Sequence, residues 1–330
     1  MSWRISILDK SPIAENESAA EALARTLRLA QLAEAAGFHR FWLAEHHNTP
    51  QLASPSPELL IAWILGQTQR IRVGSGGVML QHYSPYKVAE NFNLLASIAP
   101  GRVDLGVGKA PGGLPLSTRA LQHGHNPQEK GSFADQLTQL DRWLAPGGDE
   151  PVRATPLPPQ PAQGFLLGAS VESALLAARL NWRFVFAAHL NGDAELLREV
   201  LSAWRAHGGR ETLVAVPAIV APTQDEAQRL ASRVEVWGVE LANGQRVSVA
   251  SEEQAYAFAR QAGSEPLRIA RRAQSLLTGQ PAAVLEQLEA LHQRWGIDEF
   301  IIDTPIADGE ARLRSLQLLA QAWQAREVAA

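Results

Sequence analysis

The sequence predicts an α/β fold in the form of a single (β/α)₈ TIM-like barrel. Short apolar segments recur along the chain, amphipathic helical segments separate them, and the links between them are short. This alternation indicates crossover units on a parallel sheet. Eight repetitions favour a closed barrel over an open doubly wound sheet. A length of 330 residues suits either two domains or one enlarged barrel, and the repetitions assign residues 1–330 to one barrel.

The predicted strands are short apolar runs, as expected of strands buried on both faces of a parallel sheet. They are rich in Val, Ile, Leu and Phe and contain few charges. In chain order they cover 4–8, 41–44, 71–80, 102–107, 164–167, 184–188, 213–220 and 299–303.

Helical segments with apolar residues three or four apart fill the gaps between the strands. The first of them places Leu23 and Leu27 on one face and ends at Gly37, a residue favoured just after a helix. Pro57 stands near the start of the second, where proline costs no helical hydrogen bond. The predicted helices cover 19–36, 56–68, 85–98, 131–144, 171–179, 193–206, 281–295 and 310–326.

Two stretches lie outside the eightfold alternation. Residues 146–163 are rich in Pro and Gly and have no apolar period, which predicts a surface loop. Residues 223–280 are predicted to be a mostly helical insertion between the seventh and eighth strands. Two interpretations of this insertion are open, because it either closes over the mouth of the barrel or is an inert elaboration.

Composition excludes several classes of function. A net charge of −4 and a pI near 6.2 give no electrostatic case for binding nucleic acid or an anionic membrane. The absence of cysteine excludes disulfides, Cys-ligated zinc, iron–sulfur clusters and a thiol nucleophile. No window approaches the roughly 18 apolar residues of a spanning helix, and the start is not that of a secretory signal. We therefore expect a cytoplasmic protein.

Active sites of (β/α)₈ barrels form at the C-terminal ends of the strands. The densest polar cluster at such an end is Glu45-His46-His47, after the second strand. Adjacent strand residues point to opposite faces, so His46 and His47 do not both enter one site without a bend. We favour acid–base work or a cofactor contact over a catalytic metal, and we expect His47 to cap the strand end.

The third strand contains three glycines, Gly74, Gly76 and Gly77. Glycine weakens a strand and often marks the close approach of another backbone or a ligand. Two readings follow. A flat ligand lies against bare backbone, or the glycines relieve packing against a bulky neighbour such as Trp42 or Trp63.

A second candidate site follows the fourth and fifth strands. Gly168, Ala169 and Ser170 link a strand to the helix at 171–179, where backbone N–H groups and a hydroxyl suit a phosphate. A plain serine N-cap is the alternative. Lys109 supports the phosphate interpretation, because its Gly-rich surroundings after the neighbouring strand let an anion approach.

The chain resembles the bacterial luciferase-like flavin-dependent monooxygenases over nearly its whole length. Each matching motif is modest alone, and together they are specific. The matches are SILDKSPI (6–13), GFHRFWLAEHH (37–47), RIRVGSGGVMLQHYSPYKVAENF (70–92), PGRVDLGVGKAPGG (100–113), LLGAS (166–170), DEFIID (298–303) and RLRSLQLLA (312–320).

The resemblance implies an enzyme that binds reduced FMN (FMNH₂), reacts it with O₂ and oxygenates a small organic substrate. His46 matches the catalytic histidine of the family, and Gly76-Gly77 match a non-prolyl cis peptide beneath the isoalloxazine ring. The residues implied to bind the cofactor are Glu45, Gly76, Gly77, Lys109, Gly168, Ala169 and Ser170. No metal is implied.

Some residues depart from the family pattern. Lys109 replaces the usual phosphate-binding arginine and loses its bidentate fork, and Ala169 replaces a serine. Light emission is not implied, because the reactive cysteine of true luciferases is absent. Two other functions stay open: an F420-dependent hydride-transfer enzyme and a non-catalytic flavin-binding protein.

The resemblance also implies partners. A separate NAD(P)H flavin reductase supplies FMNH₂ transiently, and a homodimer forms through the helices at 56–68 and 85–98. Trp63, Ile64 and Phe92 are candidate contacts there, with burial in the core as the equal alternative.

Three side chains are candidates for the lining of the substrate pocket, and each is equally open to a structural role. They are His82, Tyr83 and His189.

Overall fold

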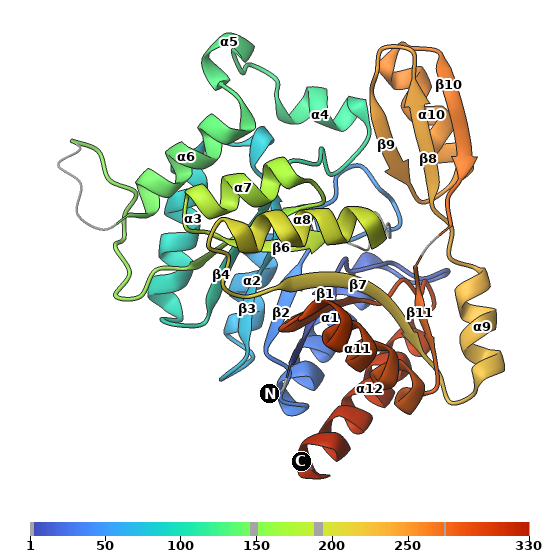
Figure 1. The fold of residues 1–330 in the computed structure, drawn as a ribbon. Coiled ribbons are helices and arrows are strands. Elements are labelled where there is room, and N and C mark those ends of the chain that lie inside the picture. The colour runs from blue at the N-terminus through green and yellow to red at the C-terminus, as the bar shows by residue number, and fades with distance from the viewer. Residues whose placement is uncertain (1–2, 146–150, 188–193, 274, 330) are drawn as a thin grey trace.

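The computed structural model describes residues 3–145, 151–187, 194–273 and 275–329. In these residues the parallel strands follow the order β7-β12-β1-β2-β3-β4-β5-β6, and a β6–β7 pairing closes the barrel that the sequence predicts. Helices surround it (Figure 1). The barrel strands are β1 (Arg4–Asp9), β2 (Arg40–Leu43), β3 (Arg72–Met79), β4 (Val103–Gly108), β5 (Gln163–Gly168), β6 (Arg183–Ala187), β7 (Leu213–Val220) and β12 (Glu299–Asp303).

The helices between the strands also match the prediction. The predicted helices are observed as α1 (Ala19–Ala35), α2 (Pro57–Leu65), α3 (Pro85–Ile98), α6 (Phe133–Leu144), α7 (Val171–Arg179), α8 (Ala194–Ala206), α11 (Pro281–Trp295) and α12 (Gly309–Ala329). The helices α3, α7 and α11 begin and end at the predicted residues, whereas α2 is shorter than predicted. Short unpredicted elements are η1 (Leu80–His82), α4 (Pro115–Leu121) and α5 (Pro127–Lys130).

The insertion contains strands as well as helices, which corrects the mostly helical expectation. Besides α9 (Gln224–Ser232) and α10 (Glu252–Ala262), it contains β8 (Trp237–Leu241), β9 (Arg246–Val249), β10 (Pro266–Arg271) and β11 (Leu277–Gly279). The strands β10, β8 and β9 form an antiparallel sheet. Its hairpin turns at Asn243-Gly244, where Gly244 has a φ of +83°. Asn-Gly between alternating segments is a strong hairpin signal.

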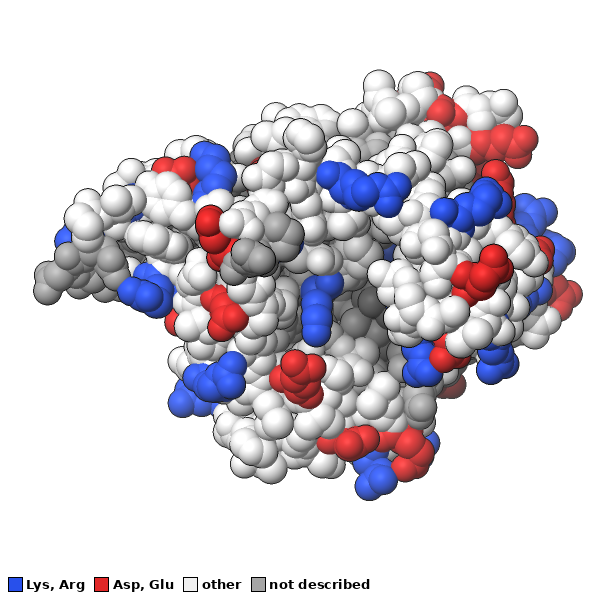
Figure 2. Space-filling view, turned by 90° about the horizontal axis from the view of Figure 1, so that it is seen from above, with Lys and Arg blue, Asp and Glu red and all other residues white. Residues whose placement is uncertain are grey.

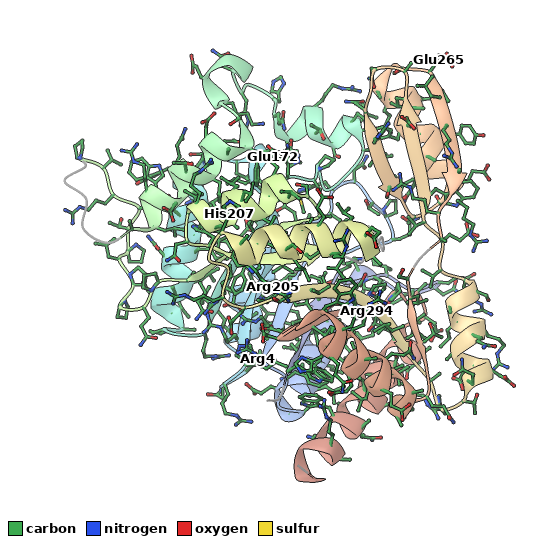
Figure 3. All side chains as sticks on the ribbon, in the orientation of Figure 1. Arg4, Glu172, Arg205, His207, Glu265 and Arg294 are labelled. Carbon is green, nitrogen blue, oxygen red and sulfur yellow. The ribbon has the colours of Figure 1, made fainter. Side chains whose placement is uncertain are left out.

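The insertion has its own small core and lies at one end of the barrel. Val239, Leu241 and Phe258 are buried together, with Leu114 from the loop after β4 packed against them. Gln261 Oε1 accepts a hydrogen bond of 3.1 Å from the backbone N–H of Leu116. In Figure 3, Arg4 at the start of β1 lies far from the distal tip of the insertion. The insertion therefore lies toward the C-terminal ends of the barrel strands.

The Pro-rich stretch has no helix or strand within its described part, residues 151–162, as predicted for a loop. Residues 146–150 lie outside the described residues. Among the helices that the structure describes, none combines the length and the apolar character needed to cross a membrane.

A layer of ion pairs fills the N-terminal end of the barrel interior. We call Arg40, Arg72, Asp104 and Glu299 the ionic layer. Arg40 donates to both Glu299 (2.6 Å) and Asp104 (2.8 Å), and Arg72 donates to Asp104 (2.6 Å). The side chains of Asp104 and Glu299 are fully buried. Because unpaired buried charges are costly, this mutual pairing explains how the layer is tolerated inside the barrel.

An apolar layer lies above the ionic layer. Its members alternate along the strands with residues that face the surrounding helices, as the two-residue period of a strand requires. They are Leu8, Trp42, Ala44, Phe165, Val185, Leu213, Ala215 and Ile301. The described interior at this level is thus a packed core and not a pore, so a ligand that binds in the barrel is expected at its C-terminal mouth.

His39, at the entry to β2, makes stability depend on pH. Burial, followed by the nearby charge of Arg40, lowers the pKa of His39 to about 4. The unfolded chain, where histidine titrates near 6.5, therefore binds more protons than the folded chain between pH 6.5 and 4. The stabilising effect of a neutral His39 is complete above this window and is lost as pH falls through it.

We expect His39→Gln to flatten this dependence. The measurement is the free energy of unfolding in urea at pH 7.5 and 5.0. Wild type loses more stability than His39→Gln on acidification, whereas His125→Gln, a change at an exposed histidine, behaves as wild type. Equal losses in wild type and His39→Gln contradict the prediction.

Candidate active site

The inner face of the barrel becomes polar at its C-terminal mouth. Lys10 and Asp303 continue the inward alternation of Leu8 and Ile301, and their side chains meet at 2.6 Å between Nζ and Oδ2. By the same alternation His46 follows Ala44 on the inner side. Seen from above, the surface of the molecule is hollowed near the middle, and both basic and acidic side chains border the hollow (Figure 2). The arrangement presents a cation and an imidazole to a ligand in the mouth.

The backbone at His46 is fixed by neighbouring loops. Ala44 N–H donates to the carbonyl of Asp9, and His46 N–H donates to the carbonyl of Ser54, both at 2.9 Å. The hydroxyl of Ser54 donates back to the carbonyl of Ala44 at 2.6 Å. The His46 side chain is half-buried. A histidine held in this way is positioned before any ligand arrives, which is what a catalytic group requires.

Glu45 points away from His46 and is buried in a network of donors. Its Oε1 accepts from the Tyr83 hydroxyl and contacts His47 Nε2, each at 2.7 Å, and its Oε2 accepts from Met79 N–H at 3.0 Å. Burial, with the charge of Glu45, raises the pKa of the Tyr83 phenol. The network fixes the end of β2 against β3 and α3. A contact between Glu45 and a cofactor stays a prediction.

His82 has a structural role. Its ring is buried, Nε2 lies 2.7 Å from the carbonyl oxygen of Pro111, and Nδ1 lies 3.0 Å from the side-chain nitrogen of Gln122. The carbonyl accepts only, so Nε2 carries the proton and Nδ1 accepts from the amide. Burial lowers the pKa of His82, which favours this neutral form. His82 therefore ties η1 to the loop after β4.

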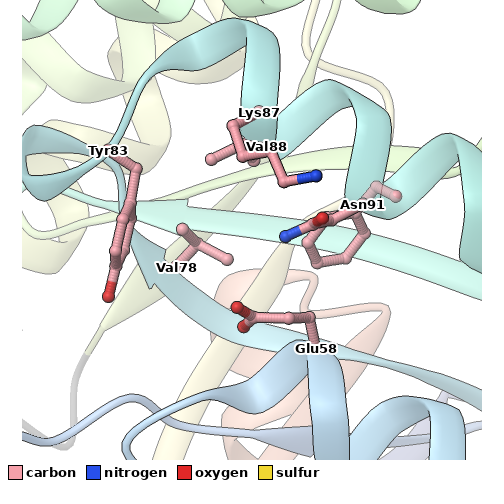
Figure 4. A pocket seen from close by; sticks show the side chains of 7 residues that line it. Glu58, Val78, Tyr83, Lys87, Val88 and Asn91 are labelled. Carbon is pink, nitrogen blue, oxygen red and sulfur yellow. The ribbon is translucent and has the colours of Figure 1, made fainter. Parts of the chain in front are cut away.

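A small cavity lies behind Tyr83, between α2, α3 and β3 (Figure 4). Glu58, Lys87 and Asn91 line it together with Tyr83, and its volume is about 40 Å³. Burial raises the pKa of Glu58, and the charge of Glu45 adds to this. A cavity of this size has room for a few waters. It is too small for a flavin or an organic substrate.

The glycines of β3 are explained by packing between protein groups. A Cβ at Gly74 would lie 2.4 Å from the carbonyl oxygen of Asp104, and one at Gly77 would lie 2.7 Å from that of Gly106. At Gly76 it would meet Leu8 Cδ1 at 2.7 Å and Trp42 at 3.2 Å. Packing therefore accounts for the lack of side chains, against β4 at Gly74 and Gly77 and against Leu8 and Trp42 at Gly76. A ligand lying on this backbone stays a prediction. The Gly76–Gly77 peptide is cis, as the resemblance implies.

The ends of β4 and β5 bring the predicted phosphate residues together. Gly108 pairs with Leu167, so Lys109 and Gly168 follow on neighbouring strands. Ser170 caps α7, because its hydroxyl accepts from Ser173 N–H at 3.2 Å. The N-cap alternative is thus confirmed, and a phosphate role stays a prediction. An exposed ammonium beside the N-terminus of a helix fits a phosphate group.

Residues 3–299 match the family model described as luciferase-like monooxygenase. The chain belongs to the luciferase-like monooxygenase family. The N-acetyl-S-alkylcysteine monooxygenase of Bacillus subtilis (strain 168) is 43% identical over 328 residues, covering 97% of this chain and 98% of that protein.

Solved structures of similar proteins agree with membership of the luciferase-like monooxygenase family. Apo-MsnO8 superposes with a TM-score of 0.80 at 30% identity, covering 98% of this chain and 99% of that one. A type II Baeyer–Villiger monooxygenase from Pseudomonas putida, solved with FMN, gives a TM-score of 0.69 at 18% identity and covers 97% of each chain. At that identity the second likeness shows the fold alone.

In this luciferase-like monooxygenase, one feature of the mouth was not predicted from the sequence, and one predicted residue lies outside the described part of the chain. The Lys10–Asp303 pair was not predicted, although both residues end neighbouring strands with inward parity. That parity was a usable signal. His189, a predicted pocket residue, lies outside the described residues. Among those described, no group of three or more His, Cys, Asp or Glu side chains has an arrangement that could hold a metal ion.

Proposed function

We propose that this protein is a flavin-dependent monooxygenase that uses reduced FMN and O₂ on a small organic substrate. One juxtaposition carries the proposal. The C-terminal ends of neighbouring strands bring together a phosphate-type donor set, Lys109 after β4 and Ser170 at the start of α7 after β5, and a half-buried histidine, His46, after β2. Membership of a monooxygenase family supports it.

Each residue group has a distinct part. Lys109 and the turn from Gly168 to Ser170 would hold the FMN phosphate, and the peptide backbone of β3 would support the ring system. Bound reduced flavin would supply the two electrons with which one oxygen atom of O₂ enters the substrate while the other leaves as water. His46 would hold or move a proton at its imidazole during this chemistry. The packed core below the mouth excludes water from the lower side.

The substrate class proposed first is that of the relative named above, N-acetylated S-alkylcysteines. The identity of 43% extends over nearly the whole of both chains. Such compounds carry a thioether sulfur, which accepts an oxygen atom, together with an amide and a carboxylate. A panel that varies the S-alkyl group therefore tests the activity most directly.

Cofactor binding is the first test. Purified protein is titrated with FMN, reduced FMN and riboflavin, and with F420 in parallel. We expect reduced FMN to bind more tightly than reduced riboflavin, because only FMN carries the phosphate. Binding of F420 alone would favour hydride transfer, and binding of none of these overturns the proposal.

Turnover is the second test. The protein, a flavin reductase and NAD(P)H are supplied with the panel of N-acetyl-S-alkylcysteines under ¹⁸O₂. We expect a product that contains one labelled oxygen atom. Binding of reduced FMN without any labelled product from the panel would favour a non-catalytic flavin-binding protein. A transient reductase partner and a cytoplasmic location stay predictions.

A homodimer through α2 and α3 is part of the proposal. The two predicted contacts Ile64 and Phe92 are core residues, whereas Trp63 is 40% exposed. The helices α2 and α3 are in contact, and we call their exposed large apolar side chains the α2–α3 patch: Leu59, Trp63, Leu94 and Ile98. An exposed apolar patch of this kind often marks an interface.

We expect Leu59→Glu to convert a dimer to a monomer. A twofold interface loses two leucines at about 1.5–3 kcal/mol each and gains two buried charges, so the dimer Kd rises by about a hundredfold or more. Light scattering coupled to size exclusion measures the mass. Leu267→Glu, at a similarly exposed leucine of the insertion, leaves the mass unchanged. A wild-type monomer, or a dimer that survives Leu59→Glu, contradicts the interface.

A further inference from the structure

The end of β1 places two side chains of opposite charge on opposite sides of the barrel wall. Asp9 points outward, where its Oδ2 accepts from the Thr26 hydroxyl at 2.6 Å and its Oδ1 lies 2.6 Å from Arg312 Nη1. Lys10, the next residue, points inward to Asp303. The charge of Asp9 is thus paired with that of Arg312 on the outer side of the wall, whereas Lys10 lies on the inner side, at the mouth.

The Lys10 ammonium is held in place but not enclosed. The side chain of Asp303 is 4% exposed and that of Lys10 is 28% exposed, so Lys10 is the more accessible partner of the pair. Among the described residues it donates one hydrogen bond, to Asp303, and an ammonium has three donors. The backbone that follows is fixed as well, since Ala53 N–H donates to the carbonyl of Ser11 at 2.9 Å.

This cation is separate from the phosphate-type donor set. Lys109 follows β4, and β2 and β3 lie between that strand and β1 in the barrel order. The strand that carries His46, β2, neighbours β1. The strand that carries His46 therefore lies between the strand that Lys10 follows and the strand that Lys109 follows.

We infer that Lys10, oriented by Asp303, binds the carboxylate of the substrate and places the rest of that molecule toward His46. This inference rests on the proposed function and deepens it by naming the class, an acid with one carboxylate and no cationic group. A lysine suits this task because it binds a carboxylate as a point charge. An N-acetylated amino acid meets the description, because acetylation removes the charge of its amine.

The test measures binding by calorimetry, so it does not depend on turnover. N-acetyl-S-benzylcysteine and N-acetylmethionine are each compared with their primary amides on FMN-loaded protein. We expect wild type to bind the acids at least about tenfold more tightly than the amides. Lys10→Gln weakens acid binding about ten- to a hundredfold, the usual range for a hydrogen bond between charged groups, and leaves amide binding and the FMN Kd unchanged.

Three further variants test whether the charge of Lys10 and its orientation by Asp303 determine the preference for acids. Lys10→Arg retains the preference for acids, Asp303→Asn reduces it, and Lys130→Gln on the short helix α5 leaves it intact. Wild type that binds no acid more tightly than its amide overturns the inference whether or not Lys10→Gln folds. A loss of FMN affinity in Lys10→Gln overturns it too, because the lysine then serves the cofactor. Acid-selective binding without oxygenation leaves the inference standing and contradicts the proposed function alone.

Discussion

Arg40→Met is expected to lower the free energy of unfolding by about 3–5 kcal/mol, the cost of breaking a buried ion pair from one side. The methionine matches the length of the arginine stem but leaves Glu299 and Asp104 without the guanidinium that binds both of them. Asp104 keeps Arg72 at 2.6 Å, whereas Glu299 keeps only Arg4 at 3.5 Å as an ion-pair partner among the described residues. Glu299 therefore loses more of its ion pairing than Asp104 does.

Urea unfolding followed by circular dichroism measures the effect. The control is Arg246→Met in the insertion, where the pair with Glu240 is exposed and is worth about 0.2–1 kcal/mol. If Arg40→Met does not fold, the double variant Arg40→Met/Glu299→Gln recovers part of the loss, because it removes the stranded charge. A loss for Arg40→Met no larger than that of the control contradicts this account.

The barrel was predictable because its signals are local. Parallel strands buried on both faces are short apolar runs, and the helices between them have clear starts, such as Pro281 at the start of α11. The insertion was harder. Two of its strands, β9 and β10, contain no fully buried residue, and they carry Arg246 and Arg268. Such strands resemble amphipathic helices in composition, and only the Asn243-Gly244 turn gave a specific signal.

A site residue could be predicted where its type and its place at a strand end were enough. Hydrogen-bond and ion-pair partners from distant segments could not be predicted. The alternation rule predicts that His46 and His47 face opposite sides, and the structure pairs His47 with Glu45. However, the donors that bind Glu45 come from β3 and from the first residues after η1, Met79 and Tyr83. The lysine–aspartate pair joins the first strand to the last, 293 residues apart. Contacts of this kind depend on barrel closure, which no local pattern records.

His46→Gln is expected to lower kcat about 10²- to 10⁴-fold, the usual contribution of a positioned acid–base group. Glutamine keeps the size and the hydrogen bonding of the side chain but does not exchange a proton near neutral pH. The backbone at this position is held by the carbonyl of Ser54 through the main-chain N–H, which the substitution keeps. FMN affinity and thermal stability should therefore change little, so that the loss lies in the chemical step.

The measurement is steady-state turnover of an N-acetyl-S-alkylcysteine with saturating reductase, together with the H₂O₂ released. A merely structural histidine would lower kcat at every pH alike. A proton-transferring one gives wild type a pH dependence near neutrality that His46→Gln lacks. His47→Gln is the matched neighbour, because His47 lies 2.7 Å from Glu45 on the other side of the strand, and it should keep the wild-type pH profile. If both variants keep that profile, the proton is handled by another group, and the role of His46 is confined to shaping the mouth.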